Sequence, residues 1–181
     1  MEAAGINDEL ILRCRQGDRE AHFKLYNLYK RSMFNACFRI LNNTEEAEDV
    51  LQDSFMSAFK NMEHYRGEST FGAWLKKIVV NKAITQVKKK KMERFPEDAR
   101  FDVKEEEEVD VFDGFPCSVE QVKNSIQKLP DGYRMVLSLY LLEGYDHREI
   151  GEILEIAEST SKSQFNRAKR KLKELIKEGM L

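Results

Sequence analysis

Long stretches of helical periodicity with few breaks constrain this chain more than any other feature. Its three prolines stand at positions 96, 116 and 130, outside the longest runs in which apolar residues recur at the spacing of an α-helix. Apolar and polar residues alternate convincingly nowhere, so the pattern of a β-strand bounded by turns is missing. The sequence therefore predicts an all-α protein.

Residues 92–117 break this periodicity and separate two groups of predicted helices. Positions 93–113 hold ten acidic residues against Arg94, Arg100 and Lys104, a composition typical of a segment that cannot bury a core. We therefore predict a helical domain over 1–91, a flexible acidic linker over 92–117 and a second helical domain over 118–181.

The first domain is expected to contain four helices. Their predicted ranges are 7–16 with Asn7 or Asp8 as cap, 18–41 ended by Asn42, 44–62 capped by Asn43, and 70–91. The second helix is expected to bury a wide apolar stripe that includes Phe23 and Leu28. YRGEST, residues 65–70, is expected to form a loop because of its glycine and hydroxyl content.

The third predicted helix has an acidic face. At 100° per residue, Asp49, Gln52, Asp53 and Met56 lie together, opposite an apolar arc. A solvated face normally interleaves lysines with its acidic residues, but here only Lys60 at the far end does so. The pattern favours a surface that meets a basic partner.

Positive charge is concentrated in two other segments, although the net charge is only −2. Residues 74–92 hold seven lysines and no acidic residue, and residues 159–177 hold seven basic residues against Glu174 alone. This segregation indicates a polyanion that is bound at two places.

The second domain contains a predicted helix-turn-helix. A helix that Ser118 opens and another that stops at Gly144 precede two shorter elements, of which the first is capped by Asp146 and the second, basic one by Ser159. Glu155 stands where the turn often has glycine, so a left-handed conformation there would be strained. Gly151 replaces the usual alanine, which we expect to be harmless.

Other classes of site are disfavoured by the sequence. Three cysteines and three histidines are scattered, with no metal-ligand spacing, so no metal or cofactor is expected. A signal pattern and an apolar run of membrane-spanning length are both missing, so we expect a soluble, cytoplasmic protein.

Four blocks in their order and spacing resemble an extracytoplasmic-function (ECF) sigma factor of bacterial RNA polymerase, of the sigma-70 family. They are EEAEDVLQDSFMSAF, YRGESTFGAWLKKIVVN, LPDGYRMVLSLYLLEGYDHREIGEIL and STSKSQFNRAKRKLKEL. The resemblance implies a sigma-two and a sigma-four domain joined by a flexible linker, and a protein that binds core RNA polymerase and promoter DNA. It also implies an anti-sigma factor as partner and no small-molecule substrate.

The resemblance assigns roles to three sets of residues. Docking on core polymerase falls to Asp49, Gln52, Asp53 and Met56. Recognition and melting of the minus-ten element, in which a base is held out of the stack, falls to Tyr65, Arg66, Gly67, Glu68, Ser69, Thr70, Lys76, Lys77, Asn81 and Lys82. Tyr65 would supply a stacking surface and Asn81 would read the captured base. Recognition of the minus-thirty-five element falls to Thr160, Lys162, Ser163, Asn166, Arg167, Lys169 and Arg170, the last two through phosphates.

Two other functions remain open from the residues. A one-component helix-turn-helix regulator would need neither the acidic helix nor the RGEST loop. An enzyme acting on nucleic acid is disfavoured, because no paired ligands, glycine-rich phosphate loop or nucleophile–base grouping is evident.

Overall fold

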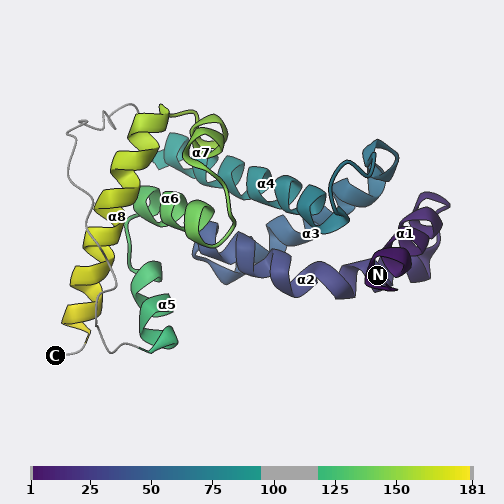
Figure 1. Ribbon diagram of the computed structural model, residues 1–181, viewed down its shortest axis with the longest axis horizontal. Coiled ribbons are helices and arrows are strands. Elements are labelled where there is room, and N and C mark those ends of the chain that lie inside the picture. Colours follow the sequence, from purple (N-terminus) through teal and green to yellow (C-terminus); the bar gives the residue numbers. More distant parts are fainter. Residues whose placement is uncertain (1, 95–117, 180–181) are drawn as a thin grey trace. The chain divides into compact units, whose positions relative to one another are not determined.

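The computed structural model describes residues 2–94 and 118–179, and this part of the chain is all-α, as predicted (Figure 1). The chain divides after Lys91 into two compact units. The helices of unit 1 are α1 (Glu2–Arg15), α2 (Arg19–Leu41), α3 (Thr44–Lys60), the short 3₁₀ helix η1 (Met62–His64) and α4 (Phe71–Arg94). The helices of unit 2 are α5 (Val119–Gln127), α6 (Asp131–Leu141), α7 (His147–Leu154) and α8 (Glu158–Glu178). Of the predicted linker, residues 92–94 continue α4, and the remainder lies outside the described residues.

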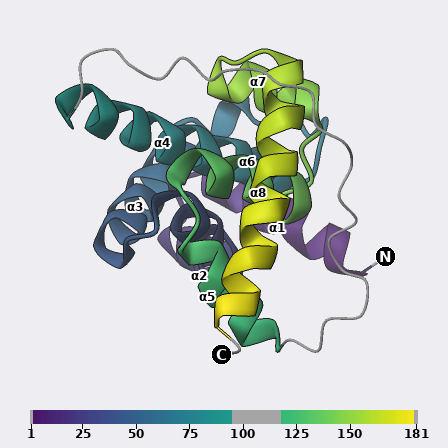
Figure 2. The same cartoon turned by 90° about the vertical axis from the view of Figure 1, so that its left-hand side faces the viewer.

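In unit 1, α2 and α3 lie side by side (Figures 1 and 2). A two-residue connection reverses the chain: Asn42 ends α2 in the left-handed conformation, at φ 52°, and the Asn43 side chain accepts a hydrogen bond from the backbone N–H of Glu46. Asparagine suits both positions, because its short polar side chain tolerates the left-handed region and can cap a helix. The predicted end of α2 and the predicted cap of α3 are confirmed.

The apolar face of α3 lies opposite the acidic face, as predicted, and is buried against α2. Its buried residues are Ala47, Val50, Leu51, Ser54, Phe55 and Ala58. Across the interface, the rings of Tyr26 and Phe55 meet edge to face at 4.8 Å between centroids. The acidic face is thereby turned outward.

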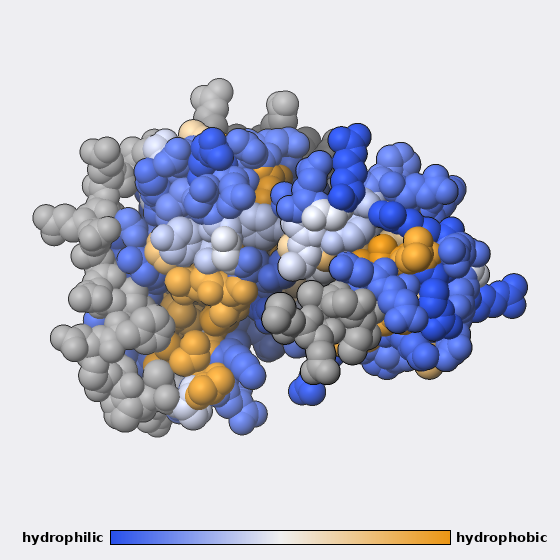
Figure 3. Space-filling view, turned by 45° about the vertical axis from the view of Figure 1, so that its right-hand side comes forward, coloured by the Kyte–Doolittle hydropathy of each residue, from blue (hydrophilic) through white to orange (hydrophobic). Residues whose placement is uncertain are grey.

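The predicted stripe of α2 was wrong in part. Phe23 and Leu28 are 66% and 57% exposed. The buried side of α2 instead contains Ala21, Leu25 and Ala36. Small side chains at the contact allow two helices to approach closely, whereas the prediction followed the spacing of the large apolar residues. Figure 3 shows that hydrophobic residues (orange) form patches on a surface that is otherwise largely hydrophilic (blue).

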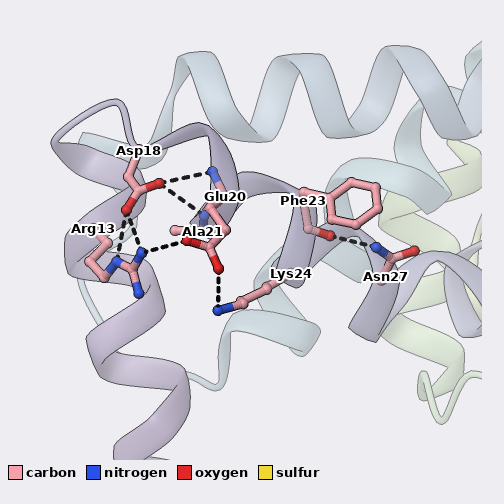
Figure 4. A network of polar contacts seen from close by, with 7 residues as sticks. All are labelled: Arg13, Asp18, Glu20, Ala21, Phe23, Lys24 and Asn27. Atoms are coloured by element: carbon pink, nitrogen blue, oxygen red, sulfur yellow. Dashed lines mark hydrogen bonds and ion pairs between the residues drawn. The ribbon is translucent and has the colours of Figure 1, made fainter.

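A polar network fixes the corner between α1 and α2 (Figure 4). Asp18 caps α2 by accepting hydrogen bonds from the backbone N–H groups of Glu20 and Ala21, and the predicted start of this helix near Asp18 is confirmed. Its other carboxylate oxygen accepts from Nε of Arg13 at 2.8 Å, and this hydrogen bond lowers the pKa of Asp18. The predicted start of the first helix at residue 7 was wrong, because α1 begins at Glu2.

In unit 2, α5, α6 and α7 each pack on α8, the long helix shown in yellow in Figure 2. Ser118 and Asp146 each form a reciprocal capping box, with Gln121 and Glu149 respectively, and these start α5 and α7. The core along α8 is formed by Phe165, Ala168, Leu172 and Ile176. Both predicted caps are confirmed.

The turn between α7 and α8 explains two residues that depart from the usual pattern. Glu155 is left-handed, with φ 59° and ψ 44°, and its backbone N–H donates to Gly151. A Cβ on Gly151 would lie 2.9 Å from the carbonyl oxygen of Ile156. Glycine at 151 therefore allows this close approach, in agreement with the expectation that it is harmless to the packing, and a larger residue would crowd the turn.

Two helix ends in unit 2 differ from their predictions. Ala157 is the N-cap of α8 without a side-chain hydrogen bond, and Ser159 already lies inside the helix. Likewise, α6 ends at Leu141, and Gly144 stands in the following turn with φ +81°. The end of α6 is instead closed by backbone hydrogen bonds from the N–H groups of Leu142 and Glu143 to the carbonyl of Ser138.

Candidate functional site

The outward face of α3 includes the four residues that the sequence singled out. Asp49, Gln52, Asp53 and Met56 are all exposed, and Met56 is 64% exposed. They are held there because the opposite side of the same helix is buried against α2. Carboxylates and an adaptable thioether on one rigid helix suit contact with a basic protein surface.

A groove next to this face was not foreseen. It lies between α2 and α3 and encloses about 600 Å³. Tyr26, Phe34 and Leu51 supply apolar walls, while Lys30, Arg31, Glu48 and Gln52 supply the polar ones. Since Gln52 belongs to both features, the face and the groove form one continuous surface. Its basic side comes from α2, which periodicity within α3 alone could not reveal.

The loop at 65–70 is attached to the core through Tyr65. The Tyr65 ring is 8% exposed and packs on Phe71 and Trp74, at centroid distances of 5.7 Å and 5.4 Å. Its hydroxyl donates to the carbonyl of Ser69 at 2.6 Å. The expectation that Tyr65 offers a stacking surface to a base is therefore wrong in this conformation, because its ring faces are covered by protein.

The remaining residues of this loop, Arg66, Gly67, Glu68, Ser69 and Thr70, are exposed. Gly67 has φ +76°, which a side-chain-bearing residue rarely adopts. The hydroxyl of Thr70 accepts from the backbone N–H of Ala73 in the first turn of α4. The loop is thus a short, open arch with both ends attached.

Helix α4 continues from this arch and carries the predicted basic residues. Asn81 and Lys77 are exposed, whereas Lys76 and Lys82 are half-buried. Trp74 is half-buried and packs on Tyr65 and Phe71. Lys90 forms an ion pair with Glu46, so this lysine joins α4 to α3 rather than adding only to a basic surface.

The residues of α8 that were predicted to bind the minus-thirty-five element differ in their exposure. Lys162 and Arg170 are exposed, whereas Thr160, Ser163, Asn166, Arg167 and Lys169 are half-buried. Lys162 is 2.7 Å from the carboxylate of Glu158, which raises the pKa of the lysine. Nζ of Lys169 lies 5.0 Å from the centre of the Phe165 ring. Both lysines therefore already have partners within the helix.

Two residues that join α7 to α8 were not identified from the sequence. Nδ1 of His147 lies 2.9 Å from the hydroxyl of Ser161, and this contact joins the two helices of the helix-turn-helix. The His147 ring also stacks on Tyr140, with centroids 4.4 Å apart. A polar residue at an inward position of α8 was the only available signal, because the two partners are separated by thirteen residues in the chain.

Comparison with known proteins covers both units. The Sigma-70 region 2 family model matches residues 25–93, and the Sigma-70, region 4 family model matches residues 120–172. The ECF RNA polymerase sigma factor SigW of Bacillus subtilis is 30% identical over 181 residues, which cover 93% of this chain and 95% of the relative. The chain belongs to the ECF sigma factors.

Other relatives agree with this assignment of the family. The RNA polymerase sigma-H factor of Pseudomonas aeruginosa is 27% identical over 90% of each chain. The sigma factor RpoE, solved in complex with the anti-sigma factor NepR from Bartonella quintana, has the same fold at a TM-score of 0.57 and 23% identity, covering 85% of this chain and 95% of that one. CnrH, solved with the cytosolic domain of CnrY, has a TM-score of 0.55 at 19% identity, covering 95% and 97%.

As an ECF sigma factor, the protein directs RNA polymerase to promoters at the initiation of transcription. Over residues 2–94 and 118–179, no cluster of histidine, cysteine and carboxylate side chains could hold a metal ion. Within the same residues, no helix is both long enough and apolar enough to cross a bilayer. Burial raises the pKa of the Cys14 thiol to about 11, which keeps it protonated.

Proposed function

We propose that this sigma factor binds core RNA polymerase through the outward face of α3. The observation that carries the proposal is the composition of that face, where Asp49 and Asp53 are exposed with no basic residue between them. The groove beside Gln52 adds apolar walls and the basic residues Lys30 and Arg31. A partner surface with basic side chains opposite the two aspartates, and with apolar and acidic side chains opposite the groove, would complement both features.

We further propose that promoter DNA is bound at two places. The arch at 66–70 and Asn81 on α4 would hold a minus-ten base outside the stack, while lysines of α4 would contact phosphates. The N-terminal half of α8 would enter the major groove at the minus-thirty-five element. The exposure of the arch, of Asn81 and of Lys162, together with the basic character of both helices, supports this assignment.

Other properties are proposed from membership of the family. An anti-sigma factor is a further partner, and two proteins of the same fold were solved in complexes with such partners or with a cytosolic domain. The chain would act in the cytoplasm and by binding rather than by catalysis.

A double charge reversal tests the docking surface. Asp49→Lys with Asp53→Lys is expected to abolish co-purification with core polymerase, because the lysines would repel a basic partner. The free energy of unfolding should change by only about 0.5 kcal/mol, since both side chains are exposed. The measurement is a pull-down with purified core polymerase, followed by transcription from a promoter library.

Glu63→Lys serves as the matched control, because Glu63 is exposed on η1 and outside the face. This single variant should bind core polymerase normally. Wild-type affinity in the double variant would show that polymerase docks elsewhere.

A further inference from the structure

The loop at 65–70 is hydrogen-bonded to α1. Nη2 of Arg15, the last residue of α1, donates to the carbonyl oxygen of Tyr65 at 2.5 Å. α1 also contacts η1, which ends immediately before Tyr65. Residues 2–15 precede the segment that the Sigma-70 region 2 family model matches, so this contact joins the loop to a helix outside that segment.

Tyr65 has its polar groups fixed on three sides. Its backbone N–H donates to Met62, its carbonyl accepts from Arg15, and its hydroxyl donates to Ser69. The hydroxyl is a donor at neutral pH, as is usual for tyrosine, and burial raises its pKa further. With its ring packed on Phe71 and Trp74, this residue cannot move without moving the start of the arch.

Arg15 is itself held in a defined position. The same last turn of α1 is attached to the start of α2 by the Arg13–Asp18 pair, which Figure 4 shows beside the cap of α2. Because α1 is fixed to α2 at this corner, its last residue is directed at the loop by rigid elements. Rigid support of this kind is what a binding loop requires to keep its geometry.

From these contacts, we infer that Arg15 and Tyr65 are positioning residues that set the geometry of the 66–70 arch for capture of a promoter base. The inference rests on the proposed function of the loop. It assigns to α1 a part in promoter opening, although α1 carries none of the predicted DNA-binding residues.

The test uses the full chain bound to core polymerase. Arg15→Met should slow promoter opening by about tenfold, because a misplaced binding group loses most of its effect. Affinity for core polymerase and initial binding to duplex promoter should not change. Arg15→Lys should restore much of the opening rate, because its ammonium can donate to the same carbonyl. Normal opening by Arg15→Met would overturn the inference.

Fluorescence gives an independent readout of the same contact. Trp74 is the only tryptophan in the chain and packs on Tyr65. In Arg15→Met, acrylamide should quench Trp74 more strongly than in the wild type, with little change in the unfolding midpoint. Unchanged quenching would show that Arg15 does not hold Tyr65. Arg19→Met is the matched control, since it removes an exposed positive charge nearby and should alter neither readout.

Two more variants separate this inference from the function on which it rests. Glu68→Ala alters the arch directly, so normal promoter opening by this variant would count against the proposed function of the loop. The quenching of Trp74 would still test whether Arg15 holds Tyr65. Tyr65→Phe keeps the buried ring and removes only the hydroxyl bond to Ser69. It should slow opening even if Arg15→Met fails to fold, and a normal rate in Tyr65→Phe would overturn the positioning role.

Discussion

His147 shows how one side chain links the two helices that form the DNA-binding motif. It is the first residue of α7, and it contacts Ser161 in the first turns of α8. Burial is the main cause that lowers the pKa of His147, and the nearby positive charge of Lys162 lowers it further. Glu158 and Asp146 act in the opposite direction. The neutral imidazole is therefore the form that suits the folded unit.

The sign of the pH effect follows from this shift. Since the pKa is lower in the folded chain than the ordinary value of 6.5, the unfolded chain binds the proton first as the pH falls. Unit 2 should keep its full stability above about pH 6.5 and lose part of it on acidification. Amide exchange of α7 and α8 at about pH 7.5 and 5.5 measures the loss.

His147→Gln provides the comparison for this prediction. Glutamine can still form a hydrogen bond with Ser161 but does not titrate, so part of the acid-induced loss should disappear. An identical pH dependence in both proteins would show that His147 does not titrate between the two states.

At the scale of an element, α8 has a buried apolar face and a basic face that is available to DNA. Phe165, Ala168 and Leu172 bury one side in the core of unit 2. Lys162 and Arg170 are exposed on the other, with Arg167 half-buried between them. In a recognition helix the N-terminal residues meet base edges and later basic residues lie nearer the backbone.

A pair of substitutions on α8 separates base reading from phosphate binding. Arg167→Ala should cost about 1–3 kcal/mol at the preferred minus-thirty-five sequence and relax the preference at one base position. Arg170→Ala should weaken binding to all sequences alike and reduce the salt slope by about one. Selection from random minus-thirty-five sequences measures both effects. Equal losses across all sequences in the two variants would mean that α8 anchors DNA only by charge.

At the scale of the whole molecule, the chain is built from two units that each bury a core of their own. Leu75 in α4 is fully buried in unit 1, and Leu172 in α8 is 1% exposed in unit 2. The candidate polymerase and minus-ten surfaces belong to unit 1, and the candidate minus-thirty-five surface belongs to unit 2. Stability and function can therefore be examined one unit at a time.

Core truncations in each unit test this division. Leu172→Ala should destabilise unit 2 by about 2–5 kcal/mol, because it leaves a cavity in a packed core. Amide protection should fall in α5–α8 and remain in α2–α4. Leu75→Ala is the matched substitution, with the reverse result expected. A uniform loss of protection in both units would indicate that the chain unfolds as one cooperative block.

The sequence by itself determined the features that depend on neighbours along the chain. The capping boxes at Ser118 and Asp146, and the outward placement of Asp49 and Asp53, follow from local hydrogen bonds and from the period of one helix. These features need no knowledge of another element. Both predicted surfaces on α3 and α8 could be proposed for the same reason.

Only the tertiary structure decided the features that depend on contacts between elements. The sequence did not indicate that α2 turns Ala21 rather than Phe23 inward, that a residue larger than Gly151 would crowd the turn of the helix-turn-helix, or that Tyr65 is covered by other rings. Nor did it indicate that Arg15 reaches a carbonyl fifty residues away. Such contacts are set by how closely two elements approach, and that distance depends on the packing of many side chains at once.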